Sequence, residues 1–336
     1  MTAPRTIGSL PTTCIQFEGK ERLRTMLPGL LFLSLGATLA ACSVASHPSQ
    51  PGHLGIARRS SDLLAVIDQP GPLEVETVNS ADWQVARSGL INLDNPVAKA
   101  ARLQDGDEPI QVFFHVVHHP TQGTFLIDTG FERALRDAPG RAAPSRFVKS
   151  FMHLEKLKFH QPLADWLEQQ RMPPAGVFMT HLHLDHAGGS PDLPGGTPIY
   201  VGPKEGTSRA FLNLFAQGTT DRDLDGKGPL QEWPFRPDAD GRFEGVLDVF
   251  GDGSLWALLV PGHTEGSTAY LARTTKGPVL FTGDTCHTAW GWNHGVEPGS
   301  FTSDRAKNAE SLERLRRLVT EHPAIDVRLG HQYLTH

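Results

Sequence analysis

The chain has 336 residues, of which 39% are hydrophobic and 20% charged, and its formal net charge is −6. This composition excludes a chain that is disordered throughout, and the mild acidic excess gives no reason to expect nucleic acid or an anionic membrane surface as a partner. Sixteen His residues against three Cys raise the expectation of a metal site, because imidazole is the commonest metal ligand in proteins.

The first element along the chain is an apolar run over residues 26–41, preceded by basic residues at positions 20, 22 and 24. The run is short for a bilayer span, and its basic flank is typical of a secretory signal. It ends in Leu39-Ala40-Ala41-Cys42, which resembles a bacterial lipoprotein signal. That resemblance implies that Cys42 becomes the first mature residue and carries a lipid, and the alternative is an ordinary cleaved signal with an incidental cysteine. We therefore expect export and a membrane contact only through a lipid anchor at Cys42.

The predicted domain boundaries follow from this reading. Residues 1–41 are expected to be an N-terminal extension and signal segment, and residues 42–70 a polar, proline-containing tether. Residues 71–336 are long enough to form one large domain with a substantial core.

Short apolar runs bounded by Gly or Pro alternate with helical patterns in this large domain. The predicted strands are residues 111–117, 124–127, 177–179, 198–201, 255–260, 269–272 and 279–281. The predicted helices are residues 161–170 and 304–319, the second with Thr302 or Ser303 as its cap. This alternation predicts a layered α/β domain.

The polar stretch over residues 207–242 is predicted to be a long surface excursion. Within it, residues 221–226 partly match the spacing of a calcium-binding loop, with Glu232 at the twelfth position. Pro229 and Pro234 argue against the exiting helix that such a loop requires, so calcium is a minor alternative.

The strongest chemical signal is the segment from Thr180 to Gly189. It places His181, His183, Asp185 and His186 together directly after the apolar run 177–179. Two histidines at alternate positions leave an extended backbone on the same side. Imidazole and carboxylate groups are ligands that zinc prefers, so the segment predicts a metal site where a strand becomes a loop.

Three further candidate ligands each follow an apolar run. His263 comes after residues 255–260, Asp284 after 279–281 and His331 after 325–329. Strands aligned in a sheet deliver the residues that follow them to the same edge, so we expect these side chains to join the first group.

From about residue 110 to 333 the sequence resembles the metallo-β-lactamase fold superfamily, and residues 125–130, Phe-Leu-Ile-Asp-Thr-Gly, are similar to its first motif. The resemblance implies an α/β fold, a four-layered αβ/βα sandwich of two internally similar halves, with residues 71–336 as the catalytic domain. Asp128 is implied to support the site through hydrogen bonds, and a simple turn residue is the alternative. The implied ligands are His181, His183 and His263 for one metal ion, and Asp185, His186 and His331 for a second, with Asp284 bridging both.

This ligand set fits two Zn²⁺ ions, and it also admits manganese, iron or cobalt because it contains no thiolate. Zinc lowers the pKa of bound water from about 15.7 towards 7, so we expect a bridging hydroxide that attacks a carbonyl at neutral pH. Asp185 is expected to orient that hydroxide as well as to bind metal.

The resemblance also narrows the set of reactions that the chain is expected to catalyse. Asp284 stands where true β-lactamases of this fold carry Cys or Ser, and His183 stands where the diiron reductases of the superfamily typically carry Glu. Nuclease members usually add a nucleic-acid-binding module, and the sequence has no basic stripe. Hydrolysis of esters, lactones, thioesters or phosphodiesters remains.

The order of motifs from Phe281 to His331 is most similar to that of the N-acyl homoserine lactonases. Those enzymes usually have Tyr three residues after the bridging Asp, where this sequence has His287. We expect His287 to be catalytic and to donate a hydrogen bond to a lactone carbonyl, with an exposed loop residue as the alternative. A small-molecule lactone or ester is the expected substrate. A glyoxalase-II-like thioesterase and a metal-binding relative without turnover stay open, as does the oligomeric state.

For other residues near these motifs we expect mainly packing or surface positions. Trp290, Trp292 and His294 either wall an apolar acyl pocket or pack in the core. Cys286 is expected to be a small buried neighbour of the site. Three histidines are expected on a strand surface: His115, His118 and His119.

Overall fold

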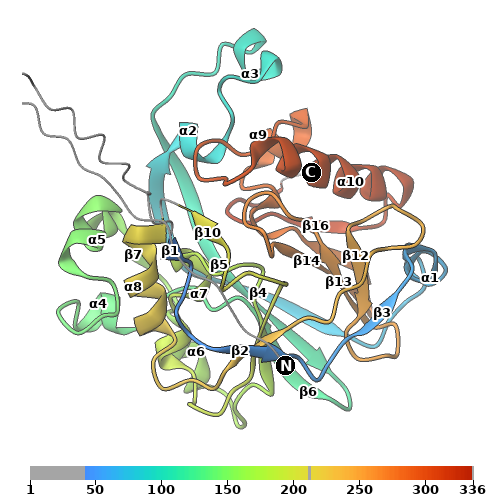
Figure 1. The fold of residues 1–336 in the computed structure, drawn as a ribbon, viewed down its shortest axis with the longest axis horizontal. Helices are drawn as coiled ribbons and strands as arrows, with labels where there is room; N and C mark the ends of the chain where they lie inside the picture. Colours follow the sequence, from blue (N-terminus) through green and yellow to red (C-terminus); the bar gives the residue numbers. More distant parts are fainter. Residues whose placement is uncertain (1–41, 211–212, 335–336) are drawn as a thin grey trace, which may run out of the picture. The chain divides into compact units, whose positions relative to one another are not determined.

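Two β-sheets form the centre of the protein, whose computed structural model describes residues 42–210 and 213–334 (Figure 1). These residues belong to one unit that spans Ala40–His336. The predicted signal segment, residues 26–41, lies outside the described residues, and so does the side chain of Cys42. Of the described helices, none has both the length and the apolar character that a bilayer crossing requires.

The larger sheet has eight described strands, and parallel and antiparallel pairs are mixed in it. In spatial order they are β2 (Ser49–Pro51), β11 (Leu230–Glu232), β9 (Ile199–Val201), β8 (Gly176–Phe178), β6 (Gly123–Ile127), β5 (Asp107–His119), β4 (Glu74–Ala86) and β7 (Lys158–Phe159). All four strands predicted for this sheet are present within a few residues of their expected bounds. β4 was not predicted, because its many polar residues hide the apolar positions that mark a strand.

The smaller sheet has six described strands and contains all three strands predicted for the later part of the chain. Its order is β16 (Asp326–Arg328), β15 (Gly277–Phe281), β14 (Thr268–Thr274), β13 (Leu255–Leu259), β12 (Gly245–Asp248) and β3 (Ile56–Arg58). A further pair joins β1 (Cys42–Ser43) to β10 (Arg209–Ala210).

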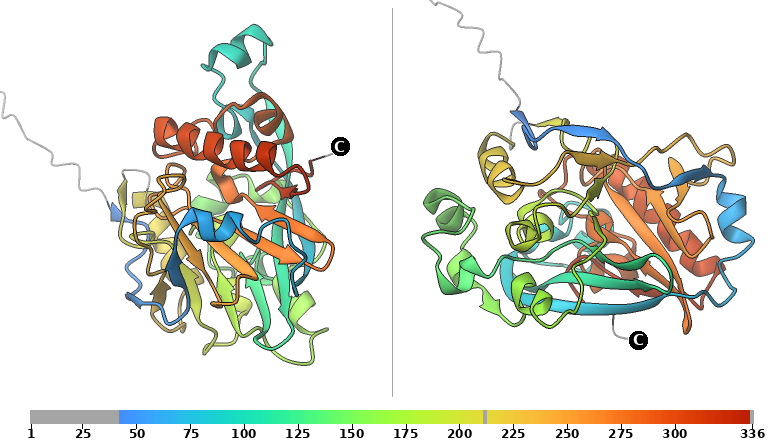
Figure 2. Two further views of the ribbon diagram at one scale, coloured as in Figure 1. Left: turned by 90° about the vertical axis from the view of Figure 1, so that its right-hand side faces the viewer. Right: turned by 90° about the horizontal axis from the view of Figure 1, so that it is seen from below.

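Helices cover the outer faces of both sheets (Figures 1 and 2). They are α1 (Ser60–Leu64), α2 (Arg87–Leu90), α3 (Pro96–Ala100), α4 (Ala134–Asp137), α5 (Arg146–Phe151), α6 (Leu163–Leu167), α7 (Leu184–Ala187), α8 (Asn213–Asp223), α9 (Ala289–His294) and α10 (Arg305–Glu321).

The core shows why the layers stack in this order. Successive residues of a strand point to opposite faces of its sheet, and in β5 Val117 packs between the two sheets while Val116 packs towards α6. On the other side, Leu312 and Leu315 of α10 pack against the outer face of the smaller sheet, next to Leu271. The layers are therefore helix, sheet, sheet, helix, and the predicted four-layered α/β sandwich is confirmed.

Residues 42–70 were expected to be a tether, but they pack against the domain. β2 pairs in parallel with β11, and β3 pairs antiparallel with β12, so the segment adds a strand to each sheet. Leu63 and Ile67 are fully buried against the smaller sheet. Burial of these apolar side chains stabilises the segment against the domain, which a polar composition alone did not indicate.

The prediction that residues 207–242 form a long surface excursion is also wrong. It contains β10, α8 and β11, and it buries Leu224, Leu230 and Trp233. A calcium loop is excluded by the helix, since its first two acidic positions, Asp221 and Asp223, lie within α8.

Helix α10 begins with a different cap from the one predicted. The carboxylate of Asp304 accepts a hydrogen bond from the backbone N–H of Lys307 at 2.9 Å, so Asp304 is the cap instead of Thr302 or Ser303. The hydroxyl of Thr302 lies instead 3.2 Å from Nδ1 of His263, at the site described below.

The expectation that His115 and His119 lie on a strand surface is wrong. His115 and His119 are 6% exposed, because β5 lies between β4 and β6 and both of its faces are covered. The ring of His115 lies against Phe281 of the other sheet, and burial lowers its pKa to about 3. His118 is partly exposed.

Candidate metal centre

The candidate ligands come together at the edge where several central strands end. β8, β13, β15 and β16 lead into the loops that carry His181, His263, Asp284 and His331 respectively. Every candidate ligand predicted from the sequence lies in one of two groups of neighbouring side chains, and Asp284 belongs to both. The loops meet as predicted, but at the ends of two sheets instead of one, since β8 lies in the larger sheet and β13, β15 and β16 lie in the smaller one.

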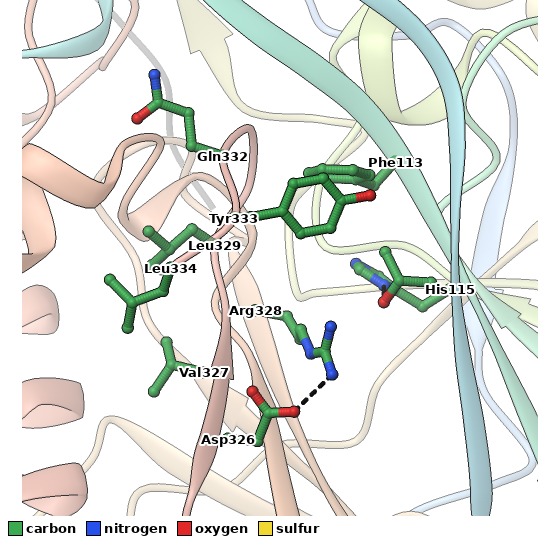
Figure 3. Close-up of a pocket in the computed structure, with 10 residues that line it drawn as sticks. Phe113, His115, Asp326, Val327, Arg328, Leu329, Gln332, Tyr333 and Leu334 are labelled. Atoms are coloured by element: carbon green, nitrogen blue, oxygen red, sulfur yellow. Dashed lines mark hydrogen bonds and ion pairs between the residues drawn. The ribbon is translucent and has the colours of Figure 1, made fainter. Parts of the chain in front are cut away.

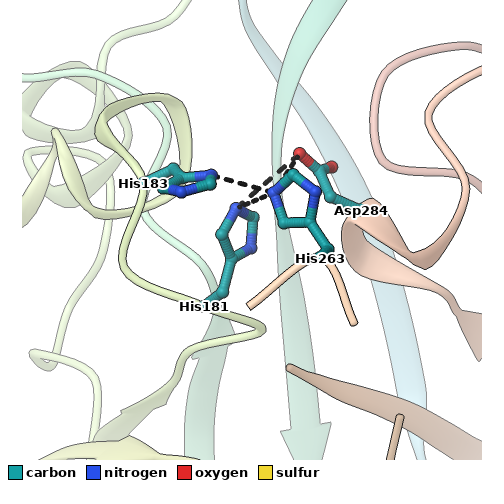
Figure 4. A group of neighbouring side chains, drawn as sticks. All are labelled: His181, His183, His263 and Asp284. Carbon is teal, nitrogen blue, oxygen red and sulfur yellow. Dashed lines mark hydrogen bonds and ion pairs between the residues drawn. The ribbon is translucent and has the colours of Figure 1, made fainter. Parts of the chain in front are cut away.

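The first group contains three imidazoles and one carboxylate (Figure 4). Nε2 of His263 lies 3.1 Å from Nε2 of His181 and 2.8 Å from Nδ1 of His183. Oδ2 of Asp284 lies 3.4 Å from Nε2 of His263 and 3.7 Å from Nε2 of His181. Four nitrogen and oxygen donors around one point match the ligand number of a zinc site.

The second group contains two imidazoles and two carboxylates. Nε2 of His331 lies 3.2 Å from Oδ2 of Asp185 and 3.4 Å from Nε2 of His186. Oδ1 of Asp284 lies 3.2 Å from both of these Nε2 atoms. Oδ2 of Asp284 lies near the imidazoles of the first group and also 3.3 Å from Nε2 of His331, so this carboxylate contacts both groups, as a carboxylate that bridges two cations does.

Glycines make room for this carboxylate. A Cβ atom on Gly330 would lie 2.2 Å from Oδ1 of Asp284, which no real contact allows. Gly283 has a φ of +49°, and a Cβ there would lie 2.7 Å from the Cβ of Thr180. The loops approach each other this closely only because neither residue has a side chain.

Asp128 supports the second group by hydrogen bonds, and it is therefore more than a turn residue. Its Oδ2 lies 2.8 Å from Nδ1 of His186 and accepts from the hydroxyl of Thr180 at 2.8 Å. Its Oδ1 accepts from the backbone N–H of Thr180 at 2.7 Å. A carboxylate only accepts, so Nδ1 of His186 carries a proton and Nε2 points into the centre.

His331 is oriented in the same manner by the backbone. Its Nδ1 lies 2.8 Å from the carbonyl oxygen of Gln111, a hydrogen-bond acceptor, so Nδ1 carries a proton and Nε2 faces the centre.

Glu205 is a supporting residue that sequence reasoning missed. Its buried carboxylate accepts from the backbone N–H of Leu182 at 2.8 Å, between two of the candidate ligands. It also accepts from the hydroxyl of Thr264 at 2.6 Å and from the backbone N–H of Gly266 at 3.1 Å, next to His263. Glu205 therefore ties together the two loops that carry the first group, and nothing in the local sequence around it signals this role.

Burial and charge set the protonation of these side chains. Burial holds the pKa of His181 and His263 well below its usual value, so both rings are neutral. Burial alone would lower the pKa of His331, but the carboxylates of Asp284 and Asp185 raise it to about 10. Burial alone would raise the pKa of Asp284, yet the imidazoles of His331, His287 and His186 hold it well below its usual range.

These features fit bound metal ions. In the first group, ring nitrogens of imidazoles that burial keeps neutral lie 2.8–3.7 Å from each other or from a carboxylate oxygen, and such a buried arrangement is repulsive unless a cation lies between them. Oδ1 of Asp284 is buried without a hydrogen-bond donor among the described residues. Imidazole and carboxylate donors without thiolate suit zinc and also accept manganese, iron or cobalt.

His287 is buried at this centre and is not an exposed loop residue. Only 1% of its surface is exposed, and its Nε2 lies 3.0 Å from Oδ2 of Asp284. Its Nδ1 lies 3.2 Å from the carbonyl oxygen of Leu90. The structure thus brings His287 together with the predicted ligands, although it is a member of neither group of four.

The other residues near His287 mainly serve packing. Trp292 is buried in the core beneath α10, which excludes it from the wall of an open pocket. Trp290 is partly buried and stacks on His294 with ring centres 4.2 Å apart. Cys286 is buried as predicted, its thiol donates to the carbonyl of Thr288, and burial raises its pKa to about 12.

A cavity of about 320 Å³ lies apart from these ligands, between β16 and the strands β4 and β5 (Figure 3). Figure 3 shows Phe113, His115, Arg328 and Tyr333 around it. None of the candidate metal ligands lines this cavity, so we place the chemistry at the metal centre, where His183 and Asp185 are partly exposed.

Comparison with known proteins agrees with this geometry. The profile of the family described as the metallo-beta-lactamase superfamily matches residues 107–331. The N-acyl homoserine lactonase AttM of Azorhizobium caulinodans is 35% identical over 157 residues, which cover 46% of this chain and 57% of that protein. The gamma-lactamase MBL2 of Gibberella moniliformis is 35% identical over 119 residues, covering 33% of this chain and 49% of that protein. The chain thus spans about half the length of the curated relatives that it matches.

Solved structures share the fold at low sequence identity. A quorum-quenching N-acyl homoserine lactone lactonase has a TM-score of 0.54 and 18% identity, over 79% of this chain and 93% of that one. A probable metal-dependent hydrolase from Staphylococcus aureus has a TM-score of 0.56 and 14% identity, over 78% of this chain and 90% of that one.

Proposed function

Because the chain belongs to the metallo-beta-lactamase superfamily, we propose that it is a dinuclear zinc-dependent hydrolase that opens the ring of a small lactone, of the N-acyl homoserine lactone type. The observation that carries this proposal is the pair of four-residue groups that share Asp284. The similarity to a protein named N-acyl homoserine lactonase supports the substrate class.

The metal centre supplies the electrophilic part of the chemistry: bound zinc polarises a carbonyl and lowers the pKa of water. His181, His183 and His263 would hold one ion, Asp185, His186 and His331 the other, and Asp284 would bridge them. The hydrogen bonds of Asp128 and Glu205 keep these ligands oriented before substrate arrives.

Asp185 is the carboxylate placed to move a proton. Its side chain is 17% exposed, whereas that of Asp284 is 4% exposed, so it reaches the open side of the centre. Burial alone would raise its pKa, but His331 and His186 hold it below the usual range, so the carboxylate is ionised at neutral pH. It would accept a proton from the attacking water and return it to the ring oxygen as the ester bond breaks.

The experiment compares ring opening by the purified chain beginning at Cys42 and loaded with zinc against a sample stripped by a chelator. An N-acyl homoserine lactone, an acyl thioester and a γ-lactam are offered to both samples. We expect lactone hydrolysis that stripping abolishes and that zinc restores. Turnover of the thioester alone would replace the proposal with a glyoxalase-II-like thioesterase, and turnover of the lactam alone would favour a lactamase.

A pair of histidine variants separates catalysis from folding. His181→Gln removes a proposed ligand and is expected to lower kcat/KM at least 100-fold. His160→Gln is the control, because His160 lies near the surface with its Nε2 2.8 Å from Asp82 and belongs to neither ligand group. Equal activity of both variants would contradict the proposed centre.

For localisation, we propose export and lipid attachment at Cys42, supported by the N-terminal sequence. β1 begins at Cys42 and pairs with β10, so a lipid there would hold the folded domain close to the membrane surface. Cys42→Ser should abolish incorporation of labelled fatty acid and release the protein from the membrane fraction, whereas Cys14→Ser should not. Retained labelling in Cys42→Ser would refute the anchor.

A further inference from the structure

We propose that the cavity between β16 and the strands β4 and β5 is a binding site for a small organic monocarboxylate with an apolar or aromatic tail, whose carboxylate pairs with Arg328 (Figure 3). The site is separate from the metal centre, because none of the candidate metal ligands lines it. The inference therefore does not depend on the proposed lactone hydrolysis.

The cavity exists because the two sheets end differently on this side of the protein. In the smaller sheet β16 is the outermost described strand, and it has only three residues. In the larger sheet β5 and β4 are neighbours with 13 residues each. The long strands and the edge of β16 enclose a space of about 320 Å³, which is within the size range of small-molecule sites.

Part of the wall is apolar and includes two aromatic rings. Phe113 of β5 is buried, and its ring centre lies 4.9 Å from that of Tyr333 at an interplanar angle of 65°. Tyr333 is 50% exposed, so its ring stands where the cavity meets solvent. Leu329 and Leu334 add aliphatic groups to the wall. Such a surface favours an apolar or aromatic tail, because contact with it removes the tail from water.

Arg328 supplies a positive charge whose hydrogen-bond donors are only partly used by the protein. Its Nη2 donates to Oδ2 of Asp326 at 2.5 Å, and its Nε is buried without an acceptor among the described residues. The side chain is 35% exposed, and Figure 3 shows it pointing from β16 towards His115. A guanidinium carries a fork of N–H donors in one plane, which matches the two oxygens of a carboxylate.

The other ionisable groups of the wall decide how much negative charge the ligand carries. Burial lowers the pKa of His115 to about 3, so this ring is neutral, and its Nδ1 lies 2.9 Å from Oγ1 of Thr77. Among the described residues that line the cavity, Asp326 is the only acidic one. Its carboxylate offsets the charge of Arg328 and repels a second negative charge on a ligand. The site therefore favours a monocarboxylate over a phosphate dianion.

The test measures binding of phenylbutyrate to the zinc-loaded protein by NMR. The reporters are the methyl groups of Val327, Leu329 and Leu334, which line the cavity. The neutral alcohol phenylbutanol and inorganic phosphate are offered in parallel. We expect phenylbutyrate to shift these methyl signals in a saturable manner. Phenylbutanol should bind at least about 10-fold more weakly, because it lacks the charge-assisted hydrogen bonds to Arg328.

Two variants test the site from different sides. Arg328→Gln removes the charge and should weaken phenylbutyrate binding at least about 10-fold. Leu334→Trp keeps Arg328 but fills the cavity, and should abolish binding. Arg316→Gln is the matched control, because the side chain of Arg316 is 32% exposed and lies 3.7 Å from the carboxylate of Glu313, outside the cavity. This control should bind phenylbutyrate as wild type does.

Several results would overturn the inference. These are wild-type affinity in Arg328→Gln or Leu334→Trp, equal affinity for the acid and the alcohol, binding of phosphate as tight as that of phenylbutyrate, and wild-type signals that do not shift. Lactone hydrolysis is measured on the same samples. Hydrolysis without phenylbutyrate binding in the cavity would refute this inference alone, whereas binding without hydrolysis would refute only the proposed function.

Discussion

Replacing Asp128 by Asn is expected to weaken metal binding at the second group without unfolding the protein. Asp128 has a φ of +59°, a left-handed conformation that Asn adopts readily, so the backbone keeps its shape. An Asn oxygen still accepts from the backbone N–H of Thr180, which the wild-type carboxylate does at 2.7 Å.

The substitution removes the hydrogen-bond acceptor of His186. The amide NH₂ of Asn would face Nδ1, where Oδ2 of Asp128 now lies 2.8 Å away. Two N–H groups repel, so the ring is driven to the tautomer with its proton on Nε2, and that nitrogen can no longer bind metal. Mutation of such supporting residues typically costs 10- to 100-fold in metal affinity, which is about 1.4–2.7 kcal/mol.

The assay is competition between the protein and a chromophoric zinc chelator, with elemental analysis for the number of ions bound. Urea unfolding of the metal-free protein should differ from wild type by no more than about 1 kcal/mol. Asp252→Asn is the matched control, because its Oδ2 also lies 2.8 Å from a histidine nitrogen, that of His119, outside the centre. Asp128→Asn with wild-type affinity for both ions would refute the tautomer reasoning.

Three further predictions test the surroundings of the centre. Gly330→Ala places a methyl group 2.2 Å from Oδ1 of Asp284. Elemental analysis should then find fewer than two zinc ions per chain. Two zinc ions per chain in this variant would contradict the prediction. In Glu205→Gln, the amide NH₂ would face a buried hydrogen-bond donor such as the backbone N–H of Leu182. The free energy of unfolding in urea should therefore fall by about 1–3 kcal/mol. An unchanged free energy of unfolding would mean that the hydrogen bonds of Glu205 to the two loops are dispensable. Burial raises the pKa of Glu132 from 4.5 to about 6, so the folded state holds its proton more tightly and wild-type stability falls as the pH rises through this range. Glu132→Gln should therefore gain about 2 kcal/mol of unfolding free energy relative to wild type between pH 4 and 8, and a pH-independent difference would refute the assignment.

Prediction from sequence succeeded where a short stretch of chain carries the whole signal. Apolar runs between turn residues located the central strands, whereas the largely polar β4 and short strands such as β12 were not predicted. Helix α8 was missed because its residues have a low apolar content, and its stability comes from packing against neighbours that the local pattern does not name.

The sequence by itself determined which side chains meet at the centre, because His181, His183, Asp185 and His186 are adjacent in the chain and the other candidates directly follow strands. The tertiary structure alone decided how those side chains are held. Glu205 reaches Thr264 across 59 positions, and Nδ1 of His331 reaches Gln111 across 220. Such contacts depend on sheet register and on the packing of one sheet against the other, which no local pattern encodes. The same reason explains His287: its residue type was visible in the sequence, but the carbonyl oxygen that lies 3.2 Å from its Nδ1 belongs to Leu90 of α2, 197 positions away.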